Sequence, residues 1–433
     1  MAVLISIAVA MVAGLLMTRV INILKMPDVT AYLIAGILIG PFFLGRLGIH
    51  GLGFVSYDEV GNLDILCNLA LGFIAFAIGA EFMLPKLKTI GRQAVVIAVV
   101  QAVLAVIFVA AALIVMHFIF PEKLSLPAAI TLGAVASATA PAATLMVVRQ
   151  YKAKGAVTDI LLPVVALDDA VGLVCFAVAV GIAKALQGGS ADVIGILVNP
   201  LLEIICSLAL GSLLGWLLTQ VEKIYHSNRN RMILIISAVT LTVALSMLEI
   251  HIGSVTISFS ALLVCMMLGT VFCNLCPMAE DLMEREDRWT APLYCLFFVL
   301  SGAALQLDVF ADVVMVAVGI IYILFRCLGK YLGSRWSAKA AKCDPMVVKY
   351  LGITLFPQAG VALGMSLSAA DLLGADGAVI RSITLFSVLI YELAGPMLTK
   401  IALTKSGDIQ PKSKEVENRR KTILDSLGKS DKD

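Results

Sequence analysis

Apolar runs of about 20 residues, separated by short polar connections, follow one another along almost the whole chain. A run of this length crosses the hydrocarbon core of a bilayer as a helix. The pattern predicts about thirteen spans, and an odd number places the two ends of the chain on opposite sides of the membrane. The expected spans are 2–22, 29–48, 63–83, 94–119, 127–148, 157–183, 194–221, 231–249, 256–274, 290–306, 311–336, 347–370 and 378–402.

Composition supports an all-α polytopic membrane protein. The chain is 60% hydrophobic and 14% charged, with a mean hydropathy of +1.00, whereas soluble domains have about 45–50% apolar and about 25% charged residues. The nine cysteines lie mostly inside apolar runs, which indicates packing and no disulfide framework. We expect a transmembrane domain over residues 1–403, a short polar cytoplasmic tail over 404–433, and no nucleic-acid partner.

Basic residues follow the alternation of the loops. The loops after odd-numbered spans hold 17 Lys and Arg residues, from Arg19 to Lys349, and the opposite loops and helix ends hold four: Arg46, Lys123, Lys184 and Arg381. Cytoplasmic loops carry the excess of positive charge. We therefore expect a multi-pass protein of the cell membrane with its N-terminus outside and its C-terminus in the cytoplasm.

Two adjacent carboxylates, Asp168 and Asp169, lie near the middle of the predicted span 157–183. A charged side chain at the bilayer centre costs about 2.5–3.5 kcal/mol on insertion scales. Neighbouring carboxylates also repel each other in a low dielectric, so both are not expected to be ionised and unpaired. The pair predicts a site that binds a proton, a cation, or each in turn.

Two spans are interrupted at mid-depth by helix-breaking and polar residues. These residues are Ser137, Thr139 and Pro141 in span 127–148, and Pro357, Gln358 and Gly360 in span 347–370. Irregular backbone at membrane depth is tolerated where it is buried in protein or lines a wet cavity. Paired breaks in the two halves of a transporter indicate its binding site. The alternative is two ordinary proline kinks.

The two breaks also suggest an internal repeat. The fourth and fifth spans match the eleventh and twelfth in pattern, and an offset of seven spans makes the repeats inverted. Thr139 and Gln358, the polar side chains at the breaks, are candidate ligands beside the aspartates.

Three further charged residues lie within predicted spans. Arg326 is near the centre of span 311–336 and needs a carboxylate partner, for which Asp168 or Asp169 is the obvious candidate. Lys330, one turn closer to the cytoplasm, is expected to extend along its apolar stem to the interface. Glu392, in the last span, is a possible intramembrane site, or only a solvated or helix-packing residue near the cytoplasmic end.

The chain resembles the bacterial second branch of the cation/proton antiporter superfamily, which includes sodium–proton and potassium–proton exchangers. The resemblance rests on KMPDVTAYLIAGILIGP (25–41), LALGFIAFAIGAEF (69–82), LFFVLSGAALQLD (296–308) and the helix with the two aspartates, and it extends over about 400 residues. It implies a homodimer with a thirteen-helix inverted-repeat fold, a mobile six-helix core and a fixed dimer domain. It also implies that the broken helices cross beside the aspartates.

By position, the resemblance makes Asp169 the main cation and proton carrier, and makes Asp168 its partner, bridged to Arg326. Thr139 would offer a hydroxyl or a backbone carbonyl. Relatives that exchange unequal charge commonly have lysine where Arg326 stands here. Because arginine keeps its proton, a pair of Asp168 with Arg326 leaves Asp169 as the one exchanging acid and predicts electroneutral transport.

The expected function is antiport of protons and a monovalent cation, Na⁺ or K⁺, by alternating access at a shared carboxylate site. We expect no enzyme activity, no cofactor and no use of ATP, since no GxxxxGK motif occurs. One alternative is an ion or pH sensor that retains the fold without transporting. Another is an organic-anion symporter, which would need anion-binding groups where this chain has acids.

Overall fold

In the computed structural model, residues 2–410 are described apart from 25, 50–51, 81, 83, 188–192, 249, 253–254 and 306–312. The helices are α1 (Ala2–Ile23), α2 (Asp28–Ile39), η1 (Leu44–Leu47), α3 (Tyr57–Gly61), α4 (Asp64–Ala80), α5 (Leu84–Ile119), α6 (Leu126–Val135), α7 (Pro141–Gln150), α8 (Ala156–Leu186), α9 (Val193–Glu222), α10 (Asn228–Ser246), α11 (Ala261–Leu275), α12 (Ala279–Ala303), α13 (Val313–Ala340), α14 (Pro345–Thr354), α15 (Gly360–Leu373) and α16 (Ala375–Ser406).

Each predicted span corresponds to one helix or to one broken pair, α6–α7 and α14–α15. Within the described residues, eight helices are long and apolar enough to cross a membrane. The shorter apolar helices include α4, α6 and α11. The all-α class is confirmed, with one small exception: strands β1 (Ile250–Ile252) and β2 (Val255–Ile257) pair antiparallel just before α11.

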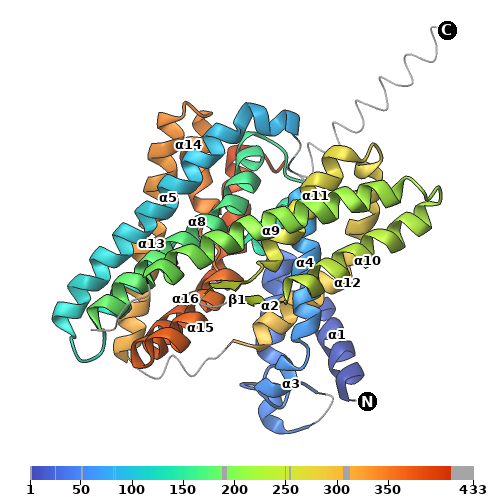
Figure 1. Cartoon of the computed structure of the whole chain (residues 1–433). Coiled ribbons are helices and arrows are strands. Elements are labelled where there is room, and N and C mark those ends of the chain that lie inside the picture. The colour runs from blue at the N-terminus through green and yellow to red at the C-terminus, as the bar shows by residue number, and fades with distance from the viewer. Residues whose placement is uncertain are drawn as a thin grey trace.

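The helices form two bundles (Figure 1). We call α5–α8 with α13–α16 the core bundle, which contains the six predicted spans of the expected core. The other group, α1, α2, α4 and α10–α12, is the scaffold bundle, and α9 packs on both α8 and α11. In Figure 1, α1 begins at the lower end of the molecule and α16 ends at the upper end, so these helix ends lie on opposite sides.

Close contact of α5 with α13 organises the core bundle. Side chains at 329 and 333 would be in the way, because a Cβ at Gly329 would lie 2.7 Å from the Cα of Ala105. A Cβ at Gly333 would lie 2.6 Å from the Cα of Gln101. Small residues let two membrane helices approach this closely. The approach brings Lys330, which follows Gly329, to the depth of Gln101.

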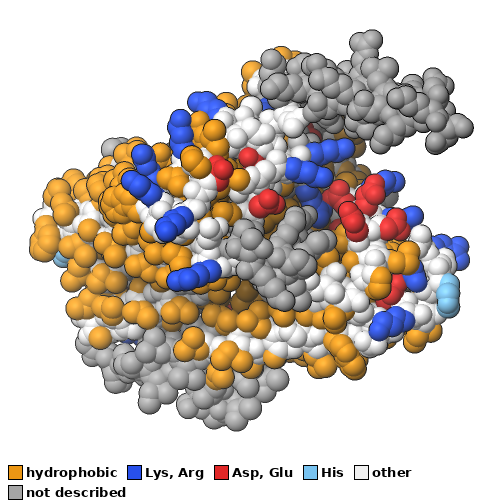
Figure 2. Space-filling model, turned by 90° about the horizontal axis from the view of Figure 1, so that it is seen from above, with side chains coloured by type: hydrophobic (Ala, Val, Ile, Leu, Met, Phe, Trp, Pro, Cys, Tyr) orange, Lys and Arg blue, Asp and Glu red, His pale blue; other side chains and the backbone are white. Residues whose placement is uncertain are grey.

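The basic end of the molecule holds several connections between helices. Figure 2 looks onto this end, where Lys and Arg side chains are spread over the surface. At the end of α7, Arg149 forms an ion pair of 2.5 Å with Asp287 of α12, which joins the core bundle to the scaffold bundle. Asp408 follows α16 and accepts hydrogen bonds of 2.8 Å from the backbone N–H and the hydroxyl of Thr158. The predicted tail therefore begins packed on α8, and its residues 411–433 lie outside the described residues.

Glu286 predicts a pH dependence of stability. It precedes the predicted span 290–306, is fully buried, and has no hydrogen-bond partner for its carboxylate within the described residues. Burial raises the pKa of Glu286 to about 8, and the Arg149 guanidinium opposes this only in part. The folded protein thus keeps a proton that the unfolded chain releases near pH 4.5. The contribution of protonated Glu286 to the free energy of unfolding is complete below pH 4.5, and it is lost as the pH rises to about 8.

Glu286→Gln should therefore flatten the decline in stability between about pH 5 and pH 8, because glutamine keeps the neutral state of the buried group. Apparent melting temperatures across this range measure the effect. Glu284→Gln is the matched control, since the Glu284 side chain is 68% exposed. If the apparent melting temperature fell equally steeply with pH in Glu286→Gln and in the unmodified protein, Glu286 would not titrate in this range.

Candidate functional site

The two interrupted helices cross and touch. Residues 136–140 separate α6 from α7, and residues 355–359 separate α14 from α15. The backbone N–H of Ala140 donates to the carbonyl of Pro357 at 2.9 Å. Pro141 occupies the first turn of α7, where its missing N–H leaves no hydrogen bond unmade. The prediction of two broken, crossing helices is confirmed, and the reading as ordinary kinks is wrong.

Arg326 binds the backbone carbonyls that the breaks leave without helical partners. Its guanidinium donates to the carbonyls of Ala136 at 2.9 Å, Ala138 at 2.6 Å and Phe356 at 2.7 Å. The last turns of α6 and α14 have unsatisfied carbonyls and carry partial negative charge. A fully buried arginine compensates both ends at once. It also lies over the ring of Tyr391, 4.5 Å from the ring centre.

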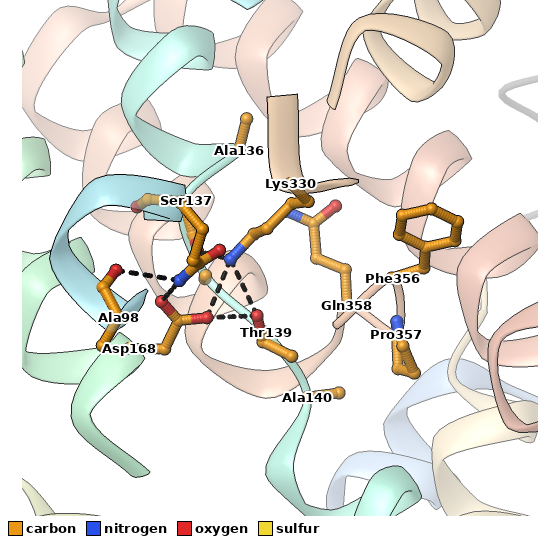
Figure 3. Close-up of polar contacts among 12 residues, drawn as sticks. Ala98, Ala136, Ser137, Thr139, Ala140, Asp168, Lys330, Phe356, Pro357 and Gln358 are labelled. Carbon is orange, nitrogen blue, oxygen red and sulfur yellow. Dashed lines mark hydrogen bonds and ion pairs between the residues drawn. The ribbon is translucent and has the colours of Figure 1, made fainter. Parts of the chain in front are cut away.

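Asp168 pairs with Lys330 instead. The Lys330 ammonium lies 2.8 Å from Asp168 Oδ2, and both side chains are fully buried. Lys330 also donates to the Thr139 hydroxyl at 2.8 Å and to the carbonyl of Ser137. Thr139 in turn donates to Asp168 Oδ2, and Gln101 of α5 donates to Asp168 Oδ1. Figure 3 shows Lys330 and Thr139 pointing to the Asp168 carboxylate.

The expected ion pair of Asp168 with Arg326 is therefore wrong, as is the expectation that Lys330 reaches the interface. The physical reason is the crossing itself. It gathers several backbone carbonyls that have no helical hydrogen-bond partner. A guanidinium has several N–H donors and can satisfy them together, and Arg326 lies next to these carbonyls. One turn along α13, the more compact ammonium of Lys330 faces the aspartate.

Asp169 lies in a different environment from its neighbour. Its side chain is 2% exposed, and neither carboxylate oxygen has a hydrogen-bond partner within the described residues. Successive residues of a helix point about 100° apart, so the two aspartates face different surroundings. Gly172, one turn after Asp169, brings α8 close to the first break: a Cβ there would lie 3.1 Å from the Ser137 hydroxyl. Gly172 also lies four residues after Asp168, so the side of α8 that adjoins the first break lies between the two aspartates.

The remaining candidates are placed as follows. Gln358 donates to the carbonyl of Val135 at 3.0 Å and to the Tyr322 hydroxyl at 2.9 Å, so within the described residues it links the breaks and forms no hydrogen bond with Asp168 or Asp169. The Ser137 hydroxyl donates a hydrogen bond to the carbonyl of Ala134 at 2.6 Å. Gly360 begins α15 with open space at its Cβ position.

Glu392 is 5% exposed, so the solvated reading is wrong. Its Oε2 has no hydrogen-bond partner within the described residues, and there it forms no ion pair with the basic residues of the site. Glu392 therefore stays either a possible site residue or a helix-packing residue.

Gln101 is the site residue that the sequence analysis missed. A usable signal existed, because Gln101 is the lone amide within the apolar run 94–116 of α5. A polar side chain at that depth needs a partner. Which partner it has depends on how α5 packs in the core bundle.

Comparison with known families decides the class of the protein. Residues 7–405 match the family model described as sodium/hydrogen exchanger, transmembrane. The chain belongs to this sodium/hydrogen exchanger family. The resemblance inferred from the sequence is thereby confirmed, and the family is one of transporters and not of enzymes.

Two curated relatives of this chain come from Arabidopsis thaliana. Cation/H(+) antiporter 19 is 24% identical over 330 residues, which are 74% of this chain and 39% of the relative. K(+) efflux antiporter 5 is 35% identical over 85 residues, which are 20% of this chain and 13% of the relative. The matched parts thus span well under half the length of both relatives.

Solved structures show the same fold. The sodium proton antiporter MjNhaP1 from Methanocaldococcus jannaschii, in its structure at pH 8, is 18% identical. It aligns with a TM-score of 0.64 over 93% of this chain and 96% of its own. Its structure from electron microscopy aligns with a TM-score of 0.67 at 17% identity over 93% and 94%. At this identity the likeness concerns the fold alone.

Proposed function

We propose that this exchanger binds a proton and a monovalent cation alternately at Asp169 and carries them across the membrane by alternating access. The observation that carries the proposal is the contrast between the two aspartates. Asp168 has hydrogen-bond partners on both oxygens, whereas the buried carboxylate of Asp169 has none among the described residues. A buried carboxylate must be neutralised, and a proton or a cation can do so.

Competition for one carboxylate is sufficient for exchange. Burial favours the protonated, neutral form of Asp169 at low pH. At higher pH a sodium or potassium ion neutralises the ionised form, helped by oxygen ligands, which suit hard cations. Because the empty, charged site is costly to move through the bilayer, only the loaded carrier crosses readily. Proton movement in one direction is thereby coupled to cation movement in the other.

The position of Lys330 changes the expected stoichiometry. Arginine keeps its proton, but lysine in a desolvated site can release it. A cation at Asp169 that also neutralises the adjacent Asp168 carboxylate takes over the role of the Lys330 ammonium and favours that release. We therefore expect two protons, one from Asp169 and one from Lys330, to leave for each cation. Exchange then moves net charge, in place of the electroneutral transport expected from a pair with Arg326.

Purified protein in liposomes tests both statements. Addition of Na⁺, K⁺ or Li⁺ outside should move protons, as an internal pH dye reports, and at least one cation should generate a membrane potential that a potential dye reports. Choline chloride at equal ionic strength is the control. No cation-dependent pH change from folded protein would favour a non-transporting sensor. A pH change without a potential would show that Lys330 keeps its proton.

We also propose a homodimer in the plasma membrane, with the N-terminus outside and a role in pH homeostasis. The excess of basic residues on the loops after odd-numbered spans supports this orientation. The exposed apolar side chains of α1, among them Val12, Leu15 and Leu16, suit a surface that lipid covers. The family resemblance supports the dimer.

A further inference from the structure

The last turn of α7 joins the core bundle to the scaffold bundle. Arg149 forms its ion pair of 2.5 Å with Asp287 of α12. The next residue, Gln150, accepts a hydrogen bond of 2.9 Å at its Oε1 from the backbone N–H of Asp28, the first residue of α2. Two neighbouring residues of one core helix thus reach two different scaffold helices.

The end of α7 has a defined cap that holds these side chains in place. Tyr151 is the last residue of the cap, and Lys152 after it has a left-handed φ of +48°. The N–H of Ala153 donates back to the carbonyl of Val148 at 2.9 Å, as in a Schellman motif. The Tyr151 hydroxyl adds a third contact with the scaffold bundle, because it donates to the carbonyl of Met26 at 3.5 Å.

The same helix begins at the ion site. Pro141 starts α7 directly after the crossing, where the N–H of Ala140 is bound to the carbonyl of Pro357. The ten residues of α7 span about 15 Å. One short helix therefore connects the crossing to the scaffold contacts. We call the contacts of residues 149–151 with the scaffold bundle the α7 latch.

We propose that the α7 latch holds the core bundle against the scaffold bundle at the basic end of the molecule, and that it must release before the ion site opens toward that side. The inference deepens the proposed function, on which it rests. Alternating access moves one helix bundle against the other around the site. A seam that hydrogen bonds bridge cannot widen while they hold. In the proposed orientation this side is the cytoplasm.

Exposure to water decides where the molecule can part. The Asp168–Lys330 pair inside the core bundle is fully buried, so breaking it would leave two charges without compensation. In the latch, the Asp287 side chain is 49% exposed and the Arg149 side chain 18%. Water replaces the partners of an exposed pair when the pair breaks, so such a pair contributes little to stability. The core bundle therefore moves as a unit, and the latch is a contact that can open and close.

Asp287→Asn tests whether the contacts of the latch open together. The variant weakens the ion pair with Arg149 and leaves the hydrogen bond between Asp28 and Gln150 in place. The Asp28 N–H lies in the first turn of α2, where the helix supplies no acceptor, so its exchange with deuterated water reports the release of Gln150. We expect this amide to exchange about two- to fivefold faster in Asp287→Asn, the factor to which one exposed ion pair corresponds. Mass spectrometry of peptides that contain Asp28 measures the rate.

Asp281→Asn is the matched control, because Asp281 pairs with Arg285 at 2.9 Å along the same helix, α12. Here the Asp28 amide should exchange at the rate of the unmodified protein. Arg149→Met removes the ion pair from the core side and is the second latch variant. An unchanged rate in both latch variants, or an equal increase in Asp281→Asn, would overturn the inference even where ion exchange is normal. A faster rate in the latch variants of a protein that moves no ions would support the latch and reject the proposed function.

Cross-linking tests whether this seam must part during transport. In the double variant Arg149→Cys with Asp287→Cys, a bifunctional thiol reagent with a reducible spacer should connect the two bundles. Cation-dependent proton exchange in proteoliposomes should be lost on cross-linking and return on reduction. The two single variants, treated in the same way, control for reaction at the nine native cysteines. Exchange at the normal rate by the cross-linked protein would show that the bundles do not part here, and would overturn the inference.

Discussion

Asp169→Asn is expected to abolish cation-dependent proton exchange. Asparagine nearly matches aspartate in shape but neither binds a proton in this pH range nor carries the negative charge that a cation needs. The carboxylate of Asp169 has no hydrogen-bond partner within the described residues, so its replacement breaks no bond seen there. The variant should therefore stay folded, and its apparent melting temperature should equal or exceed that of the unmodified protein, because a neutral amide is easier to bury than an anion.

Proteoliposomes with an internal pH dye measure the loss, and melting curves in detergent confirm the fold. Asp159→Asn is the matched control: Asp159 lies in the first turn of the same helix, α8, and is exposed. Its exchange should remain close to that of the unmodified protein. Normal exchange by Asp169→Asn would remove Asp169 from the site and with it the proposed mechanism.

Lys330→Ala is expected to destabilise the protein strongly. Removing one partner of a buried ion pair leaves an uncompensated charge, at a cost of about 3–5 kcal/mol. Lys330 contacts Asp168, Thr139 and the carbonyl of Ser137, so the loss extends to the first helix break. The apparent melting temperature should fall well below that of Lys339→Ala, a control at the exposed end of α13.

A second substitution shows whether charge is the cause. Asp168→Asn should restore part of the stability of Lys330→Ala, because the pair in contact is then neutral. The same change should give no rescue of Arg326→Ala, whose lost partners are the carbonyls of Ala136, Ala138 and Phe356. Rescue of the arginine variant and not of the lysine variant would restore the original assignment of Arg326 to Asp168.

Local pattern was sufficient for the spans, the breaks and the position of the acids. Hydropathy acts over about 20 residues, and Pro141 and Pro357 interrupt a helix through their own backbone chemistry. Asp168 and Asp169 stand out because a charge in an apolar run is costly wherever the run packs. Each of these inferences uses only the neighbours of a residue in the chain.

The partners of the charges depended on contacts between distant helices. Arg326 and Lys330 are one turn apart on α13, and the sequence gives both the same apolar surroundings. Their surroundings differ because two broken helices cross there. Ala140 donates a hydrogen bond to Pro357 at the crossing, and backbone carbonyls without helical partners surround Arg326. Arg326 therefore binds these carbonyls, and the ammonium of Lys330 forms the ion pair with Asp168.

The unequal roles of the two aspartates have the same origin. Adjacent positions on one helix look alike in the sequence, but they face about 100° apart in space. Gln101 of α5, Thr139 of the first break and Lys330 of α13 donate hydrogen bonds to Asp168, and none of them donates one to Asp169. The sequence by itself determined that acids lie at membrane depth beside two helix breaks. Only the tertiary structure decided which of the two aspartates has hydrogen-bond partners, because these hydrogen bonds form between helices that the fold brings together.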